Sequence, residues 1–219
     1  MSELTGVEWL NSPQNRAFEE RKIRLLRIAA RPVGYLCQLG IRSFDVEPIP
    51  IALEQRSLVP DKVYKITKYG RPGPANPFSN LLTKTMLDEL PTLEAIHTGQ
   101  TRLIGPRGTS PEHRERLFDS LNGASVDRWR HILTAQQNGT ISTYALQIHA
   151  KSSDPQYVNG VEPGLSDSQI AAEAQVRFEC DERDFVNASQ AYSEQLINQF
   201  RAMVVHKLAD ILHIGTNHG

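Results

Sequence analysis

Two adjacent carboxylates, Asp88 and Glu89, come shortly before a proline in the segment 85–108, TMLDELPTLEAIHTGQTRLIGPRG. Proline is tolerated in the first turn of a helix, where N–H groups have no intrahelical partner, so Pro91 predicts a helix that begins near Asp88. The free N–H groups and the dipole at a helix start favour an ionised carboxylate and can bind phosphate. An ionised carboxylate beside a second one can act as a nucleophile or hold Mg²⁺.

Ordinary helix capping also explains this pair, and the local pattern alone favours it. An aspartate at the N-cap stabilises a helix by roughly 1 kcal/mol. Thr85 followed by Asp88 in addition fits the spacing of a capping box. The local pattern therefore leaves capping and catalysis both open.

A basic turn follows one short amphipathic helix later. Gly105-Pro106-Arg107 comes after TRLI, which predicts a short strand that ends in a turn. Arg102 and Arg107 can together hold a phosphate, because guanidinium groups match phosphate oxygens in bidentate fashion. A plain turn is the alternative. The seven histidines are dispersed without a metal-binding spacing, and the sequence has no P-loop, dinucleotide fingerprint or nucleophile elbow.

Size and composition predict one substantial domain that contains the segment 85–108. The chain has 219 residues and a formal net charge of -1, which argues against nucleic acid as a partner. Two distant cysteines, Cys37 and Cys180, favour a reduced, cytoplasmic setting. No stretch approaches the roughly 20 apolar residues of a spanning helix, so we expect no membrane span.

A basic amphipathic helix is predicted over residues 22–43, after a polar N-terminal arm at 1–21. Arg24, Arg27, Arg31, Gln38 and Arg42 recur at spacings that place them on one face. We expect Pro32 to kink or split this helix. Such a helix either packs on its own domain with a solvated arginine face or lies on an anionic membrane surface.

The remaining elements complete a single domain at 22–219, with a core at 49–150 that holds the acidic pair. PIPIALEQR and KVYKITKYG read as two extended segments, 138–150 as the clearest strand, and 166–213 as two C-terminal helices. The predicted fold class is α+β: a helix-dominated single domain with a small, mainly antiparallel sheet.

The segment LLTKTMLDELPTLEAIHTGQTRLIGPRG resembles the signature of the bacterial sugar transferases, the monotopic polyprenol-phosphate phosphoglycosyl transferases. That signature reads roughly L-R-K-T-S-L-D-E-L-P-Q-L-x-N-V-x-x-G-x-M-S-L-V-G-P-R-P. The residues that match it in register are Lys84, Thr85, Leu87, Asp88, Glu89, Leu90, Pro91, Leu93, Gly99, Leu103, Gly105, Pro106 and Arg107. Weaker similarity extends upstream around Arg56 and downstream to RFECDERDFVNAS, so the resemblance covers about 49–189 discontinuously.

The resemblance implies specific roles for these residues. In the family, an Asp-Glu pair works with Mg²⁺: the aspartate attacks the β-phosphate of a nucleotide diphospho-sugar, releases the nucleoside monophosphate and passes the phosphosugar to a polyprenol phosphate. By this resemblance Asp88 is the nucleophile and Glu89 the Mg²⁺ ligand. Lys84, Arg56 and Gln147 then join the two arginines, Arg102 and Arg107, as candidate contacts to substrate phosphates.

The sequence also departs from the family, most extensively in two segments. Family members carry an apolar re-entrant helix that dips into one leaflet, but the corresponding segment here, KIRLLRIAARPVGYLCQLGIRSFD, is rich in arginine. Burying each arginine in hydrocarbon would cost about 2.5 to 3.5 kcal/mol, so we expect the dip to be lost. The nucleotide-side loop K-P-G-I-T-G-x-x-Q-V is replaced by QQNGTISTYALQI, which keeps only Gly139 and Gln147 of that pattern.

Three functions follow as hypotheses. The leading one is a soluble, cytoplasmic phosphoglycosyl-transferase-like enzyme. It would transfer a phosphosugar or phosphoryl group from a nucleotide diphospho-sugar, or a similar phosphoanhydride, to a non-lipid acceptor in natural-product biosynthesis. The alternatives are a non-catalytic subunit whose basic helix binds a partner, and a peripheral-membrane enzyme that retains the polyprenol-phosphate reaction. Whether the chain forms a homo-oligomer is left open.

Overall fold

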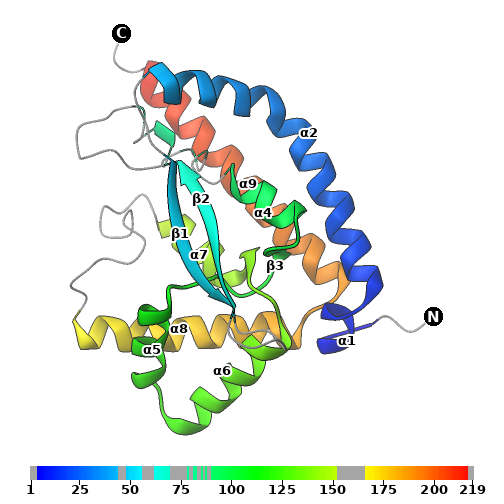
Figure 1. Cartoon of the computed structure of the whole chain (residues 1–219), viewed down its shortest axis with the longest axis vertical. Helices are drawn as coiled ribbons and strands as arrows, with labels where there is room; N and C mark the ends of the chain where they lie inside the picture. The colour runs from blue at the N-terminus through cyan, green and yellow to red at the C-terminus, as the bar shows by residue number, and fades with distance from the viewer. Residues whose placement is uncertain are drawn as a thin grey trace.

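The computed structural model describes residues 4–43, 48–55, 62–69, 78, 81–82, 85, 87, 90–151 and 166–216. Helices dominate this part of the chain, as predicted (Figure 1). The helices are α1 (Val7–Leu10), α2 (Pro13–Ser43), α4 (Thr92–His97), α5 (Pro111–Asp119), α6 (Gly123–Ala135), α7 (Thr143–Lys151), α8 (Asp167–Val186) and α9 (Gln190–Thr216). The strands are β1 (Pro48–Gln55), β2 (Lys62–Tyr69), β3 (Arg102–Ile104) and β4 (Gly139–Ile141).

The predicted sheet is wrong, because these strands form two separate pairs rather than one mainly antiparallel sheet. β1 and β2 pair antiparallel, from Pro48 opposite Tyr69 to Gln55 opposite Lys62. β3 and β4, which lie in the core, pair parallel, with Arg102 opposite Gly139 and Ile104 opposite Ile141. A parallel pair needs a long crossover connection. The helices α5 and α6 supply it here.

The strand predicted at 138–150 ends at Ile141, and the helix α7 follows at once. The Ser142 side chain accepts a hydrogen bond from the Ala145 backbone N–H at 3.0 Å, which caps the new helix. Ile141, Tyr144 and Ala145 are buried. Spacings of three and four residues are helical rather than alternating, so this burial suits a helix better than a strand.

Helix α2 begins well before the predicted start at residue 22 and includes much of the predicted polar arm. Ser12 caps it by accepting from the Asn15 backbone N–H at 3.0 Å, and Pro13 occupies its first turn. Phe18 and Glu19 on this first part are buried. The helix continues past Pro32 to Ser43 without splitting, and it bends in its second half (Figure 1).

Two hydrophobic clusters form the core of the described residues. The first joins α1, α2, α4, β3, β4 and α9 through Trp9, Leu10, Phe18, Ile23, Ile96, Leu103, Ile104, Ile141, Ala188, Leu196 and Ile197. The second joins α5, α6 and α8 through Leu117, Phe118, Val126, Trp129, Ile132, Leu133, Ile170, Ala174 and Phe178. Phe185 of α8 packs against both clusters. The β3–β4 pair is therefore part of the first cluster, and the helices of that cluster surround it.

Candidate functional site

Four of the predicted site residues, Arg56, Lys84, Asp88 and Glu89, lie outside the described residues. Arg102, Arg107 and Gln147 are described. The candidate site is therefore built from the turn that carries Arg107 and from the elements that surround that turn.

The described residues around the acidic pair correct the predicted helix start. α4 begins at Thr92 with Pro91 as its N-cap, so the helix starts later than a start near Asp88. The Leu90 N–H donates to the Leu87 carbonyl at 3.2 Å, which closes a turn just before the helix. The Thr85 hydroxyl donates to the Leu81 carbonyl at 2.7 Å instead of capping α4. Capping by Thr85, one explanation of this motif, is thus not what the structure contains.

The Gly105-Pro106-Arg107 turn is fixed against β4 by backbone contacts. The Gly105 N–H donates to the Ile141 carbonyl at 3.1 Å, and the Gly139 N–H donates to the Pro106 carbonyl at 2.9 Å. A Cβ atom at Gly139 would lie 2.2 Å from the Gly105 nitrogen, so only glycine permits this approach. Two glycines from distant segments thereby hold the turn that presents Arg107.

The Arg107 guanidinium has a hydrogen-bond donor that the described residues do not use. Its carbonyl accepts a hydrogen bond from the Arg177 guanidinium of α8. Its own Nη1 is buried and has no hydrogen-bond partner among the described residues. No described carboxylate forms an ion pair with it. A half-buried guanidinium without a carboxylate partner is well suited to an incoming anion.

A hydrogen-bonded chain lies close to Arg107. His113 Nε2 and the Tyr144 hydroxyl both bond Glu173 Oε1, at 2.9 and 3.0 Å. Burial alone would raise the pKa of Glu173, but His113, Arg177 and Tyr144 together lower it below its ordinary value, which keeps this carboxylate ionised. Burial raises the pKa of Tyr144, against the opposing charges of Arg177 and Arg107. The two guanidinium groups are therefore near enough to act on this phenol.

Arg177 connects this network to the second hydrophobic cluster. Its guanidinium lies 5.3 Å from the centre of the Tyr144 ring and 5.9 Å from that of Trp129, and the residue is buried. Trp129 Nε1 donates to Asp181 Oδ2 at 2.9 Å. Cation–π contacts and this hydrogen bond hold the guanidinium and both rings in one arrangement. Arg177 is consequently a positioning residue for the turn at Arg107.

Asp181 makes the stability of this arrangement depend on pH. Burial raises the pKa of its carboxyl to about 6, against the opposing effects of Arg177 and Trp129. The folded state then binds a proton at a higher pH than the unfolded chain does, so this group contributes stability at low pH that is lost as the pH rises through about 6. We expect the unfolding free energy of wild type, minus that of Asp181→Asn, to increase as the pH falls from neutral towards acid. Urea titrations of both proteins at several pH values measure this difference. A difference that stays constant or decreases would contradict the assignment.

A second polar network fixes the start of α7, and with it Tyr144. Asp184 of α8 accepts from the Thr143 backbone N–H at 2.7 Å and from the Tyr192 hydroxyl at 2.7 Å, and it also accepts from the Thr143 hydroxyl. These bonds tie α7, α8 and α9 together. The network is structural, because each of its polar groups already has a partner within the fold.

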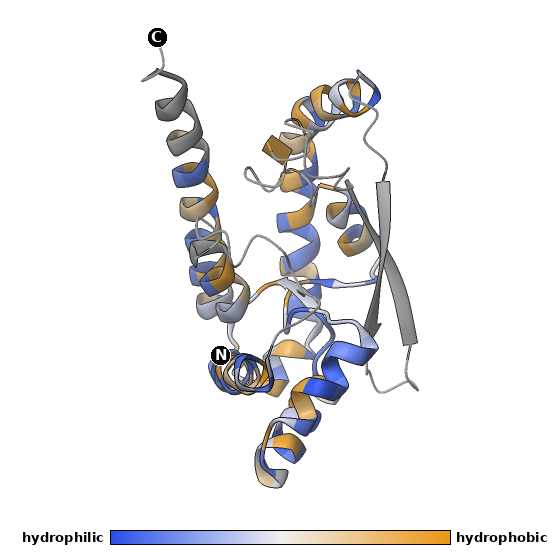
Figure 2. Cartoon of the chain, turned by 90° about the vertical axis from the view of Figure 1, so that its left-hand side faces the viewer, coloured by the Kyte–Doolittle hydropathy of each residue, from blue (hydrophilic) through white to orange (hydrophobic). Residues whose placement is uncertain are grey.

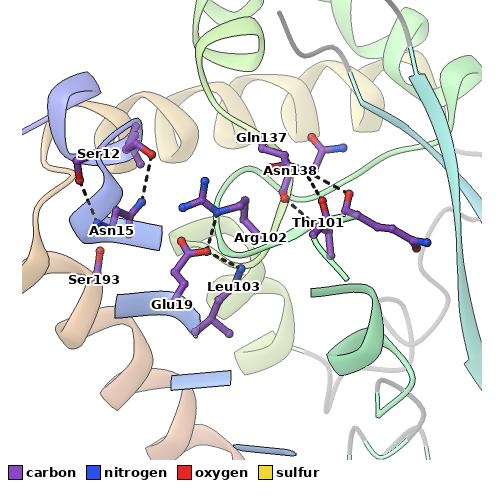
Figure 3. Close-up of polar contacts among 12 residues, drawn as sticks. Ser12, Asn15, Glu19, Thr101, Arg102, Leu103, Gln137, Asn138 and Ser193 are labelled. Atoms are coloured by element: carbon purple, nitrogen blue, oxygen red, sulfur yellow. Dashed lines mark hydrogen bonds and ion pairs between the residues drawn. The ribbon is translucent and has the colours of Figure 1, made fainter. Parts of the chain in front are cut away.

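Arg102 is not beside Arg107 in a shared cradle, because its side chain is directed to α2. Its Nε donates to Glu19 Oε2 at 2.7 Å, and the Leu103 N–H reaches the same oxygen at 3.3 Å (Figure 3). Burial raises the pKa of Glu19, against the opposing effect of Arg102. The cavity next to Arg102 has about 210 Å³. That is smaller than the roughly 300 to 1,000 Å³ of typical ligand pockets. Arg102 therefore serves to join α2 to β3.

Gln147 lies on α7, and its Oε1 accepts from the Cys180 thiol at 3.5 Å. Burial raises the pKa of Cys180 to about 11, so the thiol stays protonated at neutral pH. Within the described ranges, no group of three or more His, Cys, Asp or Glu side chains could hold a metal ion. The predicted Mg²⁺ ligand, Glu89, lies outside these ranges.

Sequence reasoning missed Arg177, His113, Glu173 and Tyr144 as site residues. The histidines looked dispersed, and Tyr144 was assigned to a strand. Only Arg177 had a readable signal, since it is the first residue of the family-like segment RFECDERDFVNAS.

Two broader findings bear on the site. Hydrophobic and hydrophilic residues alternate along the helices (Figure 2), and no helix among the described residues is both long and apolar enough to cross a membrane.

Compared with known proteins, the chain matches no protein-family model and no curated protein. The resemblance to the sugar transferases therefore rests on the matched residues alone.

Proposed function

We propose that the protein is a phosphoglycosyl-transferase-like enzyme that acts on a nucleotide diphospho-sugar or a similar phosphoanhydride. A carboxylate oxygen of Asp88 attacks the β-phosphorus and forms a new P–O bond. The anhydride bond to the α-phosphate breaks, and the nucleoside monophosphate leaves with the bonding electron pair. An acceptor oxygen then attacks the same phosphorus and loses its proton to solvent, the P–O bond to Asp88 breaks, and the free carboxylate is regenerated. Glu89 would hold a Mg²⁺ ion that neutralises charge on the substrate phosphates.

The single observation that carries the proposal is the setting of Arg107. This residue belongs to the same motif as Asp88 and Glu89. Its turn is held by the contact between Gly105 and Gly139, and its Nη1 lacks a partner among the described residues. A guanidinium that is fixed in place and free to bind can orient a phosphoryl group for attack without reorganisation.

A non-lipid acceptor is part of this proposal. The family that the chain resembles meets its lipid acceptor through an apolar re-entrant helix. The corresponding segment, 22–45, carries five basic residues and one acidic residue, Asp45. Insertion of that many charges into hydrocarbon would be costly. An acceptor dissolved in water requires no such insertion.

The direct test is a screen of nucleotide diphospho-sugars with Mg²⁺ for release of nucleoside monophosphate, with and without a chelator. The proposal predicts release from at least one of them, and no release once the metal has been removed. If no nucleotide sugar is bound or turned over by well-folded protein, the chain is not an enzyme of this kind.

Replacing Arg107 with glutamine is expected to lower kcat/KM by about 10- to 100-fold, the value of one charge-assisted hydrogen bond. Arg107→Lys should retain part of the activity, because it keeps the charge but not the bidentate geometry. Steady-state kinetics of monophosphate release measure both effects. Arg201→Gln, at an exposed arginine of α9, is the matched control and should be unaffected. Equal kcat/KM for Arg107→Gln and the control would show that Arg107 does not bind the substrate.

A further inference from the structure

Helix α2 carries a row of large apolar side chains that face solvent. Leu25, Ile28, Tyr35, Leu36 and Leu39 are between 44% and 66% exposed. Their spacings of three, seven, one and three residues place them on one side of the helix, and the exposed Pro32 lies on the same side. We call these five residues the α2 stripe. The helix runs along the outer edge of the molecule (Figure 1).

The opposite side of α2 is already occupied by its own domain. Ile23 and Cys37, on that side, are buried. Arg27 forms an ion pair with Glu94 of α4 at 2.9 Å. The described part of the domain therefore packs against the other side of α2 and leaves the α2 stripe uncovered.

Such a row is unusual on a protein surface. Single exposed apolar residues are common and need no explanation, and Val186 of α8 and Val205 of α9 are examples here. Contiguous apolar patches bordered by polar residues mark interaction sites. Five neighbouring large side chains on one helix make a patch of this kind.

The charges around the α2 stripe define what could bind it. Residues 21–43 contain the basic side chains Arg21, Lys22, Arg24, Arg27, Arg31 and Arg42 and no acidic ones. Arg24, Arg31 and Arg42 are exposed, and their spacings of seven and eleven residues align them along one border of the stripe. A second copy of this helix would bring like charges together. The binding partner should be anionic.

The shape of α2 favours a lipid surface over a protein partner. α2 is a single bent helix along the outer edge of the molecule (Figure 1). A stable protein interface usually buries about 800 Å² on each partner, which needs a broader surface. A bilayer surface is fluid and can adapt to a single convex helix. Basic residues beside a solvent-exposed apolar face are the pattern of helices that lie in the membrane interface.

We propose that α2 docks the protein on an anionic lipid surface and lies in the plane of that surface. The α2 stripe enters the boundary between headgroups and acyl chains, while Arg24, Arg31 and Arg42 contact the lipid phosphates. This mode differs from re-entrant insertion, because the arginines stay at headgroup level. The inference does not depend on the proposed reaction and is tested without catalysis.

Flotation of the full chain with lipid vesicles tests the docking. Vesicles of phosphatidylcholine with about one third phosphatidylglycerol should carry the protein at low salt, and vesicles of phosphatidylcholine alone should carry much less. High salt should weaken the association, because it screens the arginines. Arg24→Gln/Arg31→Gln should bind anionic vesicles more weakly and with a smaller dependence on salt.

A pair of double variants separates the α2 stripe from general exposed apolar area. Leu25→Gln/Leu36→Gln should lower the partition coefficient by about tenfold or more. Val186→Gln/Val205→Gln removes side chains of similar exposure on other helices and should bind like wild type. Circular dichroism checks that all variants are folded.

Three outcomes would overturn the proposal. The first is no binding of folded wild type to anionic vesicles at low salt. The second is equal binding by the two double variants. The third is a stable dimer by light scattering that Leu25→Gln/Leu36→Gln converts to monomer, since the stripe would then be an interface between two copies of the chain.

Discussion

Asp88→Asn is expected to abolish the release of nucleoside monophosphate from a nucleotide diphospho-sugar. Asparagine keeps the size of the side chain but cannot attack phosphorus to form the covalent intermediate. Loss of an enzyme nucleophile lowers turnover by about a thousandfold or more. The measurement is kcat for monophosphate release at saturating substrate and Mg²⁺. Because the carboxylate is lost and not the binding groups, the affinity for the nucleotide sugar should change much less than kcat.

The matched control for this change is Asp119→Asn, at an exposed aspartate that ends α5. It should leave both turnover and thermal stability unchanged. Wild-type turnover by a folded Asp88→Asn protein would exclude Asp88 as the nucleophile.

Gly139→Ala is expected to have the largest effect on stability among single substitutions at the site. The new Cβ would lie 2.2 Å from the Gly105 nitrogen and 2.4 Å from the Ile104 carbonyl carbon, and both are backbone atoms that cannot turn aside. The β3–β4 pair must separate, which we expect to cost about 3 kcal/mol or more. The turn at Arg107 moves with it, so kcat/KM should fall as well. Chemical denaturation and steady-state kinetics measure the two effects.

Gly123→Ala provides the control for this substitution. Gly123 is the first residue of α6, and a Cβ there would meet no atom within 4 Å. The change should be neutral or should stabilise the protein by up to about 1 kcal/mol, since alanine is the better helix former. If Gly139→Ala were as stable and active as Gly123→Ala, the close glycine contact would not be what positions Arg107.

The C-terminal helices could be predicted because their signals are local. Helices predicted at about 167–183 and 189–213 correspond to α8 and α9. The capping box from Ser166 to Gln169 fixes the start of α8. Equivalent signals for α5 and α6 were present but unused. Ser110 followed by Pro111 caps the first, and Asn122 caps the second. These two helices were therefore readable from the sequence.

The core sheet was not readable in the same way. The stretch from Gly139 to Lys151 begins as a strand and becomes a helix after Ser142, and its apolar residues fit both periods over so short a length. Parallel pairing of β3 with β4 joins segments that are separated by two helices. Local propensity carries no information about such a pairing, which depends on tertiary packing.

Among the residues of the candidate site, only those that belong to one contiguous sequence motif could be predicted. Arg107 belonged to the matched segment, which predicted it as a phosphate-binding residue. Arg177 lies 70 positions further along the chain and reaches the Arg107 carbonyl only through the packing of α8. Arg102 was expected beside Arg107 but bonds Glu19, because α2 extends further towards the N-terminus than its pattern suggested.

Trapping the covalent intermediate tests the central claim most directly. Wild-type protein is mixed with Mg²⁺ and a nucleotide diphospho-sugar that it cleaves, without acceptor, and quenched with acid for intact-protein mass spectrometry. The account predicts a mass increase equal to one phosphosugar, located by peptide mapping on Asp88 and absent from Asp88→Asn. Release of nucleoside monophosphate with no adduct, or an adduct on another residue, would contradict it.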